Sequence, residues 1–304
     1  MAEILAKLKE KQASREVSQE GYEKPVTCKK CQDMKVIIYR VHKDTKWFED
    51  NEYSTLIPED KVLESDFLLG HVCPPNKAWE WRTTYSSVCE CVKRDRTNNL
   101  LKSSEITEEF SELGFRNFQT GGKPQAIVDA YDTAYEYFGK FNEIKNKRQN
   151  SIALLGEPGS GKTHLLTAVS NNLMRKFSFS VLYFPFVEGF DDLRDDFDAL
   201  ETKLNRMKKV DVLFIDDLFK PAAGKPRASE FTIEKMYSVI NYRYLNKKPI
   251  LISSELTVDN LVKVDPALGS RIYEMCEDYV VQIVGETMEL NHRLKSLRGI
   301  NKPK

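Results

Sequence analysis

Short apolar runs alternate with longer segments of helical periodicity between residues 151 and 284. The apolar runs have the length and composition of strands that are buried on both faces of a sheet. Since alternating strands and helices imply right-handed crossovers, the pattern predicts an α/β domain with a parallel sheet between helices. Strands are predicted at 151–155, 181–184, 210–215, 249–252 and 279–284, and helices at 124–141, 164–176, 191–208 and 231–245.

The turn between the first predicted strand and its helix is rich in glycine, and it reads Gly-Glu-Pro-Gly-Ser-Gly-Lys-Thr at residues 156–163. Glycine lets a backbone turn tightly and bring its N–H groups against phosphate oxygens. At this spacing Lys162 provides a charge for the β- and γ-phosphates, and Thr163 provides a hydroxyl for Mg²⁺. Because a strand precedes the turn and a helix follows it, the pattern predicts a phosphate-binding loop rather than an ordinary glycine turn.

Polar side chains follow two further predicted strands at the point where each strand ends. Carboxyl ends of parallel strands meet at one edge of a sheet, where ligands bind. Asp216 is predicted to hold Mg²⁺ together with Thr163, and Asp217 to orient the water that attacks ATP. An aspartate pair that caps the next helix is the alternative. The predicted nucleotide-binding residues are Gly156, Glu157, Pro158, Gly159, Ser160, Gly161, Lys162, Thr163, His164, Asp216 and Ser254.

Composition limits the class of protein. The chain has 304 residues, of which 41% are hydrophobic and 30% are charged, as in a soluble globular protein. Its formal net charge is zero, so binding to nucleic acid would require a local basic patch. No apolar run approaches the length of a membrane span, and the charged stretch from Glu3 onward lacks the apolar core of a signal peptide. We therefore expect a cytoplasmic protein with no membrane partner.

Five of the six cysteines lie in the first third of the chain. In a reducing compartment such clustering favours a metal site over disulfides. Cys28 and Cys31 form one pair, and Cys89 and Cys91 form a second. If both pairs bind one ion, a tight turn is needed at Glu90, between the two cysteines of the second pair. Otherwise His71 or Cys73 would supply the fourth ligand. Unrelated thiols are the alternative. The predicted ligands of one tetrahedral Zn²⁺ are two cysteine pairs about sixty residues apart, Cys28 with Cys31 and Cys89 with Cys91.

Two arginines and one basic segment are further candidates. Arg271 precedes the last predicted strand and is expected to reach the nucleotide of a neighbouring subunit, where an arginine finger is worth about a thousandfold in rate. A surface salt bridge is the alternative. Arg293 is a weaker candidate for the phosphates of its own chain. Residues 220–227 are basic and broken by Gly and Pro, so they form either a solvated loop or a contact for single-stranded DNA.

The combination of motifs resembles the DnaC/DnaI-type replicative helicase loaders of bacteria and their phages over the whole chain. The resemblance implies an AAA+ ATPase core that binds single-stranded DNA, and an N-terminal domain that binds a hexameric DnaB-type helicase. It also implies that ATP governs loading, with Lys162, Thr163, Asp216 and Asp217 as nucleotide and Mg²⁺ residues and Arg271 as a finger in trans. Besides the cysteine pairs and the phosphate loop, it rests on Leu101-Lys-Ser-Ser104, Leu213-Phe-Ile-Asp-Asp217, Ile240-Asn-Tyr-Arg-Tyr244, Ile252-Ser-Ser-Glu255 and Leu268-Gly-Ser-Arg-Ile272.

The predicted organisation is a zinc-binding, helicase-interacting domain at 1–98, a linker at 99–122 and an AAA+ domain at 123–304. Only about twenty residues follow the last predicted strand, so no helical lid is expected. Glu255 stands where many relatives have Asn, which leaves the water-sensing role of that position open. The predicted linker contains three bulky residues that either pack near the adenine or dock on the core, Phe110, Phe115 and Phe118.

Two classes of function are expected. The first is an ATP-hydrolysing helicase loader that forms homo-oligomers on assembly. The second is a nucleotide-gated, DNA-binding adaptor that barely hydrolyses, such as a helper ATPase of transposition. The zinc module favours the loader. Asp217, which is one methylene shorter than the Glu of many such ATPases and predicts slow hydrolysis, leaves room for the adaptor.

Overall fold

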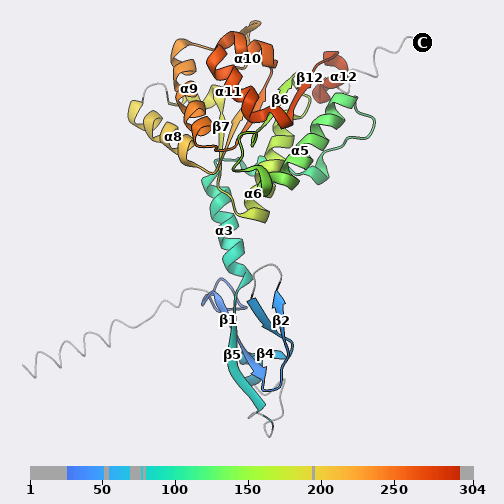
Figure 1. Ribbon diagram of the computed structural model, residues 1–304, viewed down its shortest axis with the longest axis vertical. Helices are drawn as coiled ribbons and strands as arrows, with labels where there is room; N and C mark the ends of the chain where they lie inside the picture. Colours follow the sequence, from blue (N-terminus) through green and yellow to red (C-terminus); the bar gives the residue numbers. More distant parts are fainter. Residues whose placement is uncertain (1–25, 51–54, 69–76, 78–79, 194–195, 295–304) are drawn as a thin grey trace, which may run out of the picture. The chain divides into compact units, whose positions relative to one another are not determined.

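The computed structural model describes residues 26–50, 55–68, 77, 80–193 and 196–294 (Figure 1). The chain divides into two compact units, unit 1 (Met1–Asp95) and unit 2 (Arg96–Lys304). The division falls within helix α3 (Glu90–Ser103). None of the helices in the described part of the chain combines the length and the apolar character that crossing a membrane requires.

Unit 1 is a small β-rich module. Strands β1 (Val36–His42), β4 (Lys61–Leu63) and β5 (Trp81–Val88) form an antiparallel sheet in the order β4-β1-β5. Strands β2 (Trp47–Asp50) and β3 (Thr55–Pro58) form a separate antiparallel pair, and helix α2 (Glu64–Leu68) follows β4. Among the described residues of this unit, one buried cluster consists of Ile37 and four cysteines, Cys28, Cys31, Cys89 and Cys91, and Val41 is buried as well.

Unit 2 is built on a five-stranded, wholly parallel sheet in the order β12-β6-β11-β8-β7. The central strands are continuous apolar runs because both of their faces are covered. This confirms the predicted α/β class with a parallel sheet between helices. The strands are β6 (Ile152–Gly156), β7 (Val181–Pro185), β8 (Val212–Asp216), β11 (Ile250–Ser254) and β12 (Val280–Ile283).

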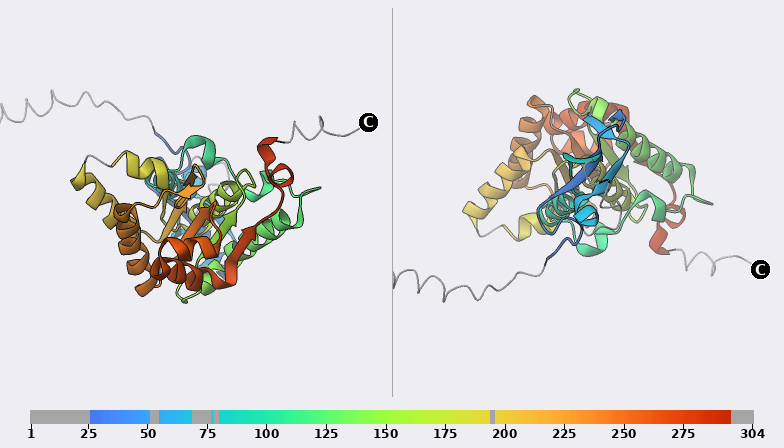
Figure 2. Two further views of the ribbon diagram at one scale, coloured as in Figure 1. Left: turned by 90° about the horizontal axis from the view of Figure 1, so that it is seen from above. Right: turned by 90° about the horizontal axis from the view of Figure 1, so that it is seen from below.

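Two layers of helices cover the sheet (Figure 2). Alternate strand residues face the two layers, so that Leu154 packs into one hydrophobic core and Leu155 into the other. One layer contains α5 (Gln125–Ile144) and α6 (Lys162–Phe177). The other contains α7 (Phe186–Asp191), α8 (Phe197–Lys209), α9 (Glu230–Leu245), α10 (Val258–Val264) and α11 (Pro266–Cys276).

The structure differs from the predicted elements in three places. The helix predicted at 191–208 corresponds to α8, which begins only at Phe197 because Asp196 caps it by accepting a hydrogen bond from the Ala199 N–H at 2.9 Å. The short helix α7, which ends at Asp191, was not predicted. Helices α10 and α11 were not predicted. The segment 220–227 forms a hairpin of β9 (Pro221–Ala222) and β10 (Lys225–Pro226). After η3 (Glu277–Tyr279) and β12, the described residues contain one short helix, α12 (Thr287–Leu290).

The segment predicted as a linker, 99–122, packs on the core of unit 2. It contains the end of α3, α4 (Glu108–Ser111) and the 3-10 helix η2 (Phe115–Asn117), and Phe115 is buried. The side-chain amide of Asn171 on α6 donates to three carbonyls of this segment, at 2.8 to 3.1 Å. The backbone is therefore held against the phosphate-loop helix, and the division between the units lies at Asp95 rather than at residue 98.

Arg243, in the segment 240–244, has a structural role at the base of the sheet. Its side chain is fully buried at the amino-terminal edge of the sheet. Burial lowers its pKa to about 9, and five carbonyl oxygens surround the guanidinium group. These contacts hold the end of α8 against the starts of β8 and β11. The five acceptors are the carbonyls of Met207, Lys208, Val210, Asp211 and Pro249.

Candidate functional site

The phosphate loop runs from the end of β6 to the start of α6, as predicted. Gly156 has a φ of +106°, and a Cβ there would lie 2.2 Å from the Ile283 carbonyl oxygen of β12. Gly161 has a φ of +96°, and its Cβ would lie 2.6 Å from the ring of Phe118. Only glycine fits both positions, because each needs a left-handed backbone and leaves no room for a side chain.

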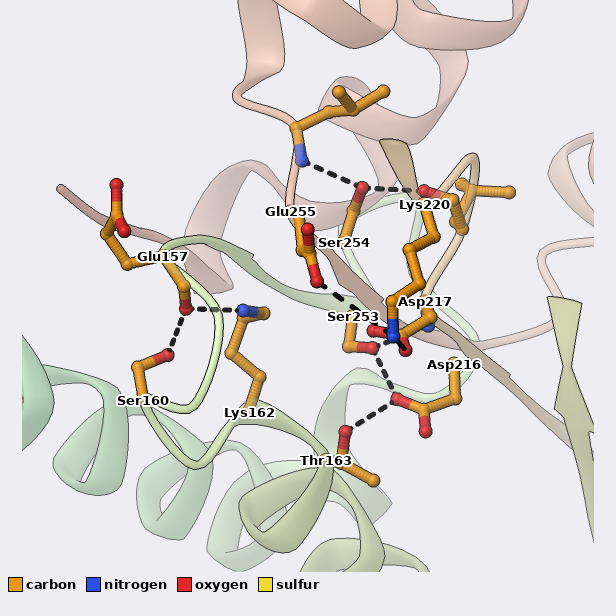
Figure 3. A network of polar contacts seen from close by, with 12 residues as sticks. Glu157, Ser160, Lys162, Thr163, Asp216, Asp217, Lys220, Ser253, Ser254 and Glu255 are labelled. Carbon is orange, nitrogen blue, oxygen red and sulfur yellow. Dashed lines mark hydrogen bonds and ion pairs between the residues drawn. The ribbon is translucent and has the colours of Figure 1, made fainter. Parts of the chain in front are cut away.

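Lys162 lies inside this loop with only 5% of its surface exposed. Its ammonium group donates to the carbonyl oxygens of Gly156 at 2.8 Å and Glu157 at 2.7 Å. Burial lowers the pKa of Lys162 to about 8, although the carboxylates of Asp217 and Glu255 act in the opposite direction. Figure 3 shows the side chain bent back toward the loop. The group is therefore a cation in a poorly solvated position, where it attracts an anion strongly.

Asp216 is the last residue of β8, and its carboxylate accepts hydrogen bonds from three hydroxyl groups. The Thr163 hydroxyl donates to Oδ1 at 2.9 Å, and Ser253 donates to the same oxygen. The Tyr183 hydroxyl donates to Oδ2 at 3.1 Å. Burial raises the pKa of Asp216, and these hydroxyls oppose that rise. The donor set fits Mg²⁺, since a carboxylate and a threonine hydroxyl are the hard oxygen ligands that this ion uses beside phosphates.

Asp217 adopts a left-handed backbone, with a φ of +55°, directly after the strand. Its N–H donates to the Ser253 hydroxyl at 2.8 Å. Its carboxylate forms an ion pair with Lys220 at 2.6 Å, and Lys220 also lies 4.0 Å from the Glu255 carboxylate (Figure 3). Glu255 thus belongs to a charged group around Lys220. The predicted attacking-water residue is therefore held by a cation of its own chain.

Ser254 is corrected from a nucleotide-binding residue to a structural one. Its hydroxyl is fully buried, donates to the Leu218 carbonyl at 2.7 Å and accepts the N–H of Leu256 at 3.1 Å. It is not among the residues that line the nucleotide cavity. Because successive strand residues point to opposite faces, Ser253 reaches Asp216 and Ser254 cannot.

The phosphate loop, Asp216 and Asp217 border a cavity of about 610 Å³ at the carboxyl edge of the sheet. Its lining includes Lys162, Thr163 and Asp216, and Pro158, Gly159, Ser160, Gly161 and His164 also contribute. The predicted residues Gly156 and Glu157 contribute carbonyl oxygens to Lys162 instead. The opposite wall is made by the segment 105–123 through Phe110, Leu113, Asn117 and Phe118.

His164 and two aromatic residues, Phe110 and Phe118, line another part of this cavity. The His164 ring lies edge-on to Phe118 at 5.1 Å, and its Nε2 is 3.1 Å from the Gly114 carbonyl oxygen and from the Asn117 side-chain oxygen. Phe110 and Phe118 line the cavity and also pack against the core of unit 2. Packing near the adenine stays a prediction. The apolar surface suits a flat aromatic base.

Sequence reasoning missed Tyr183 and His292. Tyr183 carries a hydroxyl group near the end of the strand predicted at 181–184. A polar group at that position could have indicated a contact with the site at the carboxyl edge of the sheet. His292 lines the cavity beside Arg293, and its N–H donates to the Gly159 carbonyl at 2.8 Å. The sequence offered only its neighbour Arg293 as a candidate for the phosphates of the same chain, and Arg293 does line the cavity.

Arg271 lies on α11 and is not among the residues that line the cavity of its own chain. Its Nε donates to the Asn241 side-chain oxygen at 3.0 Å, and NH1 donates to the Ala267 carbonyl at 2.7 Å. The guanidinium carbon lies 5.2 Å from the ring centre of Tyr237 and 5.5 Å from that of Tyr244. The side chain is therefore held in place on the surface of α11.

The four predicted cysteine ligands come together in unit 1. All four sulfur atoms lie within 4.8 Å of one another and are buried. Cys28 is 3.8 Å from Cys89, and Cys31 is 3.5 Å from Cys91. Cys89 follows β5 and Cys91 lies in the first turn of α3, so a strand-to-helix turn at Glu90 directs both thiols to one point. His71 and Cys73 lie outside the described residues.

The fold and the cavity define a phosphate-loop nucleotide-binding protein. The chain belongs to the family of IstB-like ATP binding proteins, because the model of that family matches residues 138–296. Two Bacillus subtilis (strain 168) relatives are more than half identical. Uncharacterized protein YqaM is 58% identical over 88% of this chain and 85% of its own length. Phage-like element PBSX protein XkdC is 62% identical over 70% of this chain and 80% of its own length.

More distant matches share parts of the chain. The chromosomal replication initiator DnaA of Mycoplasma genitalium is 26% identical over 59% of this chain and 39% of its own length. The crystal structure of DnaI has a TM-score of 0.48 and 22% identity, and it covers 60% of this chain and 94% of that one. The DnaC helicase loader structure has a TM-score of 0.46 and 24% identity, and it covers 59% of this chain and 100% of that one.

Proposed function

We propose that this protein is an ATP-dependent loader that places a DnaB-type replicative helicase on single-stranded DNA. The observation that carries the proposal is the joint occurrence of two units. A cavity equipped for ATP hydrolysis lies in unit 2, and a separate module with a four-cysteine cluster lies in unit 1. The sequence similarity to a replication initiator over part of the chain supports a role in replication.

The residues of the cavity account for ATP hydrolysis. A water oxygen bonds to the γ-phosphorus, the bond from that phosphorus to the β–γ bridging oxygen breaks, and ADP keeps the electron pair. Asp217 orients the water and accepts its proton, which then passes to solvent. Lys162 and the loop N–H groups stabilise the charge on the phosphates. Thr163 and Asp216 would hold Mg²⁺, which would supply positive charge for the phosphates when bound.

The cysteine cluster fits zinc. A tetrahedral ion with Zn–S bonds of about 2.3 Å separates the sulfur atoms by about 3.8 Å. The observed separations, 3.8 Å for Cys28 and Cys89 and 3.5 Å for Cys31 and Cys91, agree with that value. A structural ion would hold unit 1 together, since the rest of its core is small. We assign to this unit the contact with the helicase.

The hairpin at 221–226 supports contact with single-stranded DNA. Lys225 and Arg227 are exposed, and Arg227 also borders a cavity of about 380 Å³. Three aromatic side chains line that cavity. Phe186 and Phe190 are buried in the core, whereas Phe231 is 40% exposed. One exposed ring beside exposed cations suits a single strand, whose bases stack and whose phosphates need neutralising. The three rings belong to Phe186, Phe190 and Phe231.

The second candidate, a nucleotide-gated adaptor that barely hydrolyses, is favoured by the ion pair between Asp217 and Lys220. A carboxylate that is paired with an ammonium group accepts a proton less readily. If the pair persists when ATP is bound, hydrolysis would be slow and the nucleotide would act chiefly as a switch. In contrast to a loader, such an adaptor would bind DNA and a partner protein but would not load a helicase.

Co-purification with the replicative helicase of the host separates the two candidates. The full chain should retain the helicase, and Lys162→Ala should retain it without ATP-dependent release. Cys28→Ser should lose it, whereas Cys276→Ala, which changes a cysteine buried in unit 2, should not. Nucleotide affinity is measured on the same samples, and Lys162→Ala should bind ATP poorly while melting like the wild type. A wild-type chain that binds ATP but retains no helicase would contradict the loader and favour the adaptor.

A further inference from the structure

Lys220 is the one residue of the basic segment 220–227 that lines the nucleotide cavity. Its ammonium group lies 2.6 Å from the Asp217 carboxylate and 4.0 Å from that of Glu255. Both carboxylates line the same cavity. Figure 3 shows the lysine side chain between these two acids. The cation is therefore placed among the groups that an incoming nucleotide meets.

The backbone that carries Lys220 is held in an unusual shape. Asp217 and Phe219 are both left-handed, with φ values of +55° and +51°, although neither is glycine. Two contacts fix this turn: the Leu218 N–H donates to the Ser253 carbonyl at 2.9 Å, and the Lys220 N–H donates to the Asp217 carbonyl at 3.0 Å. Strained residues persist where the surrounding structure holds them, and they often serve a site. Here the turn directs Lys220 back over the cavity.

The ion pair itself contributes little to stability. The Lys220 side chain is 41% exposed and that of Asp217 is 30% exposed, and pairs in contact with water are weak. Hydrogen bonding to Asp217 raises the pKa of Lys220, so its charge is secure at neutral pH. A weak pair with a permanent charge exchanges readily for a more highly charged acceptor. The terminal phosphate of a triphosphate is such an acceptor.

We infer that Lys220 recognises the terminal phosphate of a nucleoside triphosphate by exchanging its bond to Asp217 for one to that phosphate. This inference rests on the proposed function, because Asp217 must lie beside the reacting phosphate to orient the water. The exchange discriminates triphosphate from diphosphate. It also frees the Asp217 carboxylate for the proton of the water only when the substrate is bound.

The test is equilibrium binding of ADP and of the non-hydrolysable β,γ-imido analogue of ATP to the full chain with Mg²⁺. Lys220→Met keeps an unbranched side chain that is one heavy atom shorter and removes the charge. It should weaken the triphosphate analogue about tenfold, as expected for one charge-assisted hydrogen bond, and change ADP affinity by less than about twofold. Lys220→Gln should behave in the same way. Lys209→Met, which changes an exposed lysine at the end of α8 outside the cavity lining, should change neither affinity.

Equal weakening of both nucleotides, or no change in either, would overturn the role of Lys220. Wild-type protein and Lys162→Ala keep this outcome separate from failure of the proposed function. If the wild type binds both nucleotides and Lys162→Ala does not, the nucleotide site stands, and the ratio of the two affinities in Lys220→Met decides the inference alone. If the wild type binds neither nucleotide, both proposals fall.

Discussion

At the scale of single residues, the environment of Lys162 sets the conditions under which a nucleotide binds. The side chain is nearly fully buried, and burial lowers its pKa from 10.5 to about 8. A bound phosphate would raise that pKa again, because the negative charge favours the protonated amine. At a pH between the Lys162 pKa of the free protein and that of the complex, nucleotide binding must be accompanied by uptake of a proton by this amine.

ATP affinity should therefore fall as the pH rises through 8. Below pH 8 the amine is already charged, and above it each bound nucleotide must take up a proton, so the affinity should drop about tenfold between pH 7 and pH 9. Calorimetry in two buffers of different ionisation enthalpy measures the uptake. Lys162→Arg stays charged throughout and should bind without a proton. A wild-type affinity that is constant over this range would show that the amine is fully charged before the nucleotide arrives.

Arg271 should act only between subunits. Arg271→Ala should bind ATP nearly as the wild type does but hydrolyse it about a thousandfold more slowly. Mixing it with Lys162→Ala should restore part of the activity, since the second variant donates an arginine to the intact loop of the first. Turnover is measured for the mixture and for each variant alone, with single-stranded DNA present. No rescue, together with a lower melting temperature, would mean that the contacts with Asn241 and the two tyrosines are the whole role of Arg271.

At the scale of elements, the β9–β10 hairpin is a short exposed projection at the carboxyl edge of the sheet. Its turn, Ala223 and Gly224, has positive φ at both positions, as a tight hairpin requires. Few contacts hold its tip, so its charges can be reversed without disturbing the core. It is therefore a suitable element for a test of binding to DNA.

Reversing Lys225 and Arg227 to Glu should weaken binding to single-stranded DNA and flatten its salt dependence. Loss of two phosphate contacts lowers the slope of log affinity against log salt by about 1.4. A matched control reverses Lys140 and Lys176, two exposed residues of the α5–α6 layer. Affinities are compared across a salt series. An unchanged slope in the hairpin variant would place the DNA contact elsewhere.

The element pattern was predictable where local signals were strong. The five strands follow from continuous apolar runs, and α5, α6 and α9 follow from helical periodicity. The late start of α8 depends on a single cap at Asp196, which periodicity does not register. Helices α10 and α11 have 7 and 11 residues, so neither exceeds the shortest window in which helical periodicity is decisive. The packing of 99–122 depends on Asn171, about sixty residues further along, and could not be seen locally.

At the scale of the whole molecule, the two units should respond independently to loss of metal. Chelation should unfold unit 1, because a four-cysteine ion and a few apolar residues are its core, and should leave nucleotide binding by unit 2 intact. Elemental analysis should give one zinc per chain, also in Cys276→Ala, whereas Cys28→Ser should lose it. Circular dichroism and ATP affinity before and after chelation report on the two units. Native protein that is folded and free of metal would rule the zinc site out.

The candidate site was predictable as far as its parts lie next to one another in the chain. The phosphate loop and the Asp pair were found from short motifs, because each is a strand end followed by a fixed set of residues. The sequence did not show which of the two serines contacts Asp216. That depends on the face of the sheet to which each side chain points, and Ser253 is the one that reaches the site. Tyr183 and His292 belong to the site only through the order of the strands and the path after β12, and these are tertiary properties.

The order of the sheet bears on how the protein is made. Strand β6 carries the phosphate loop, yet both of its neighbours come late, so that Ile152 pairs with Leu251 and Ala153 pairs with Val280. On the ribosome, β6 must wait unpaired until most of the chain has been synthesised, whereas Cys28 and Cys89 are both available much earlier. Pairings over such separations form slowly, and domains tend to fold in the order in which they emerge. A chain interrupted before Val280 would therefore contain a completed cysteine module and no working nucleotide site.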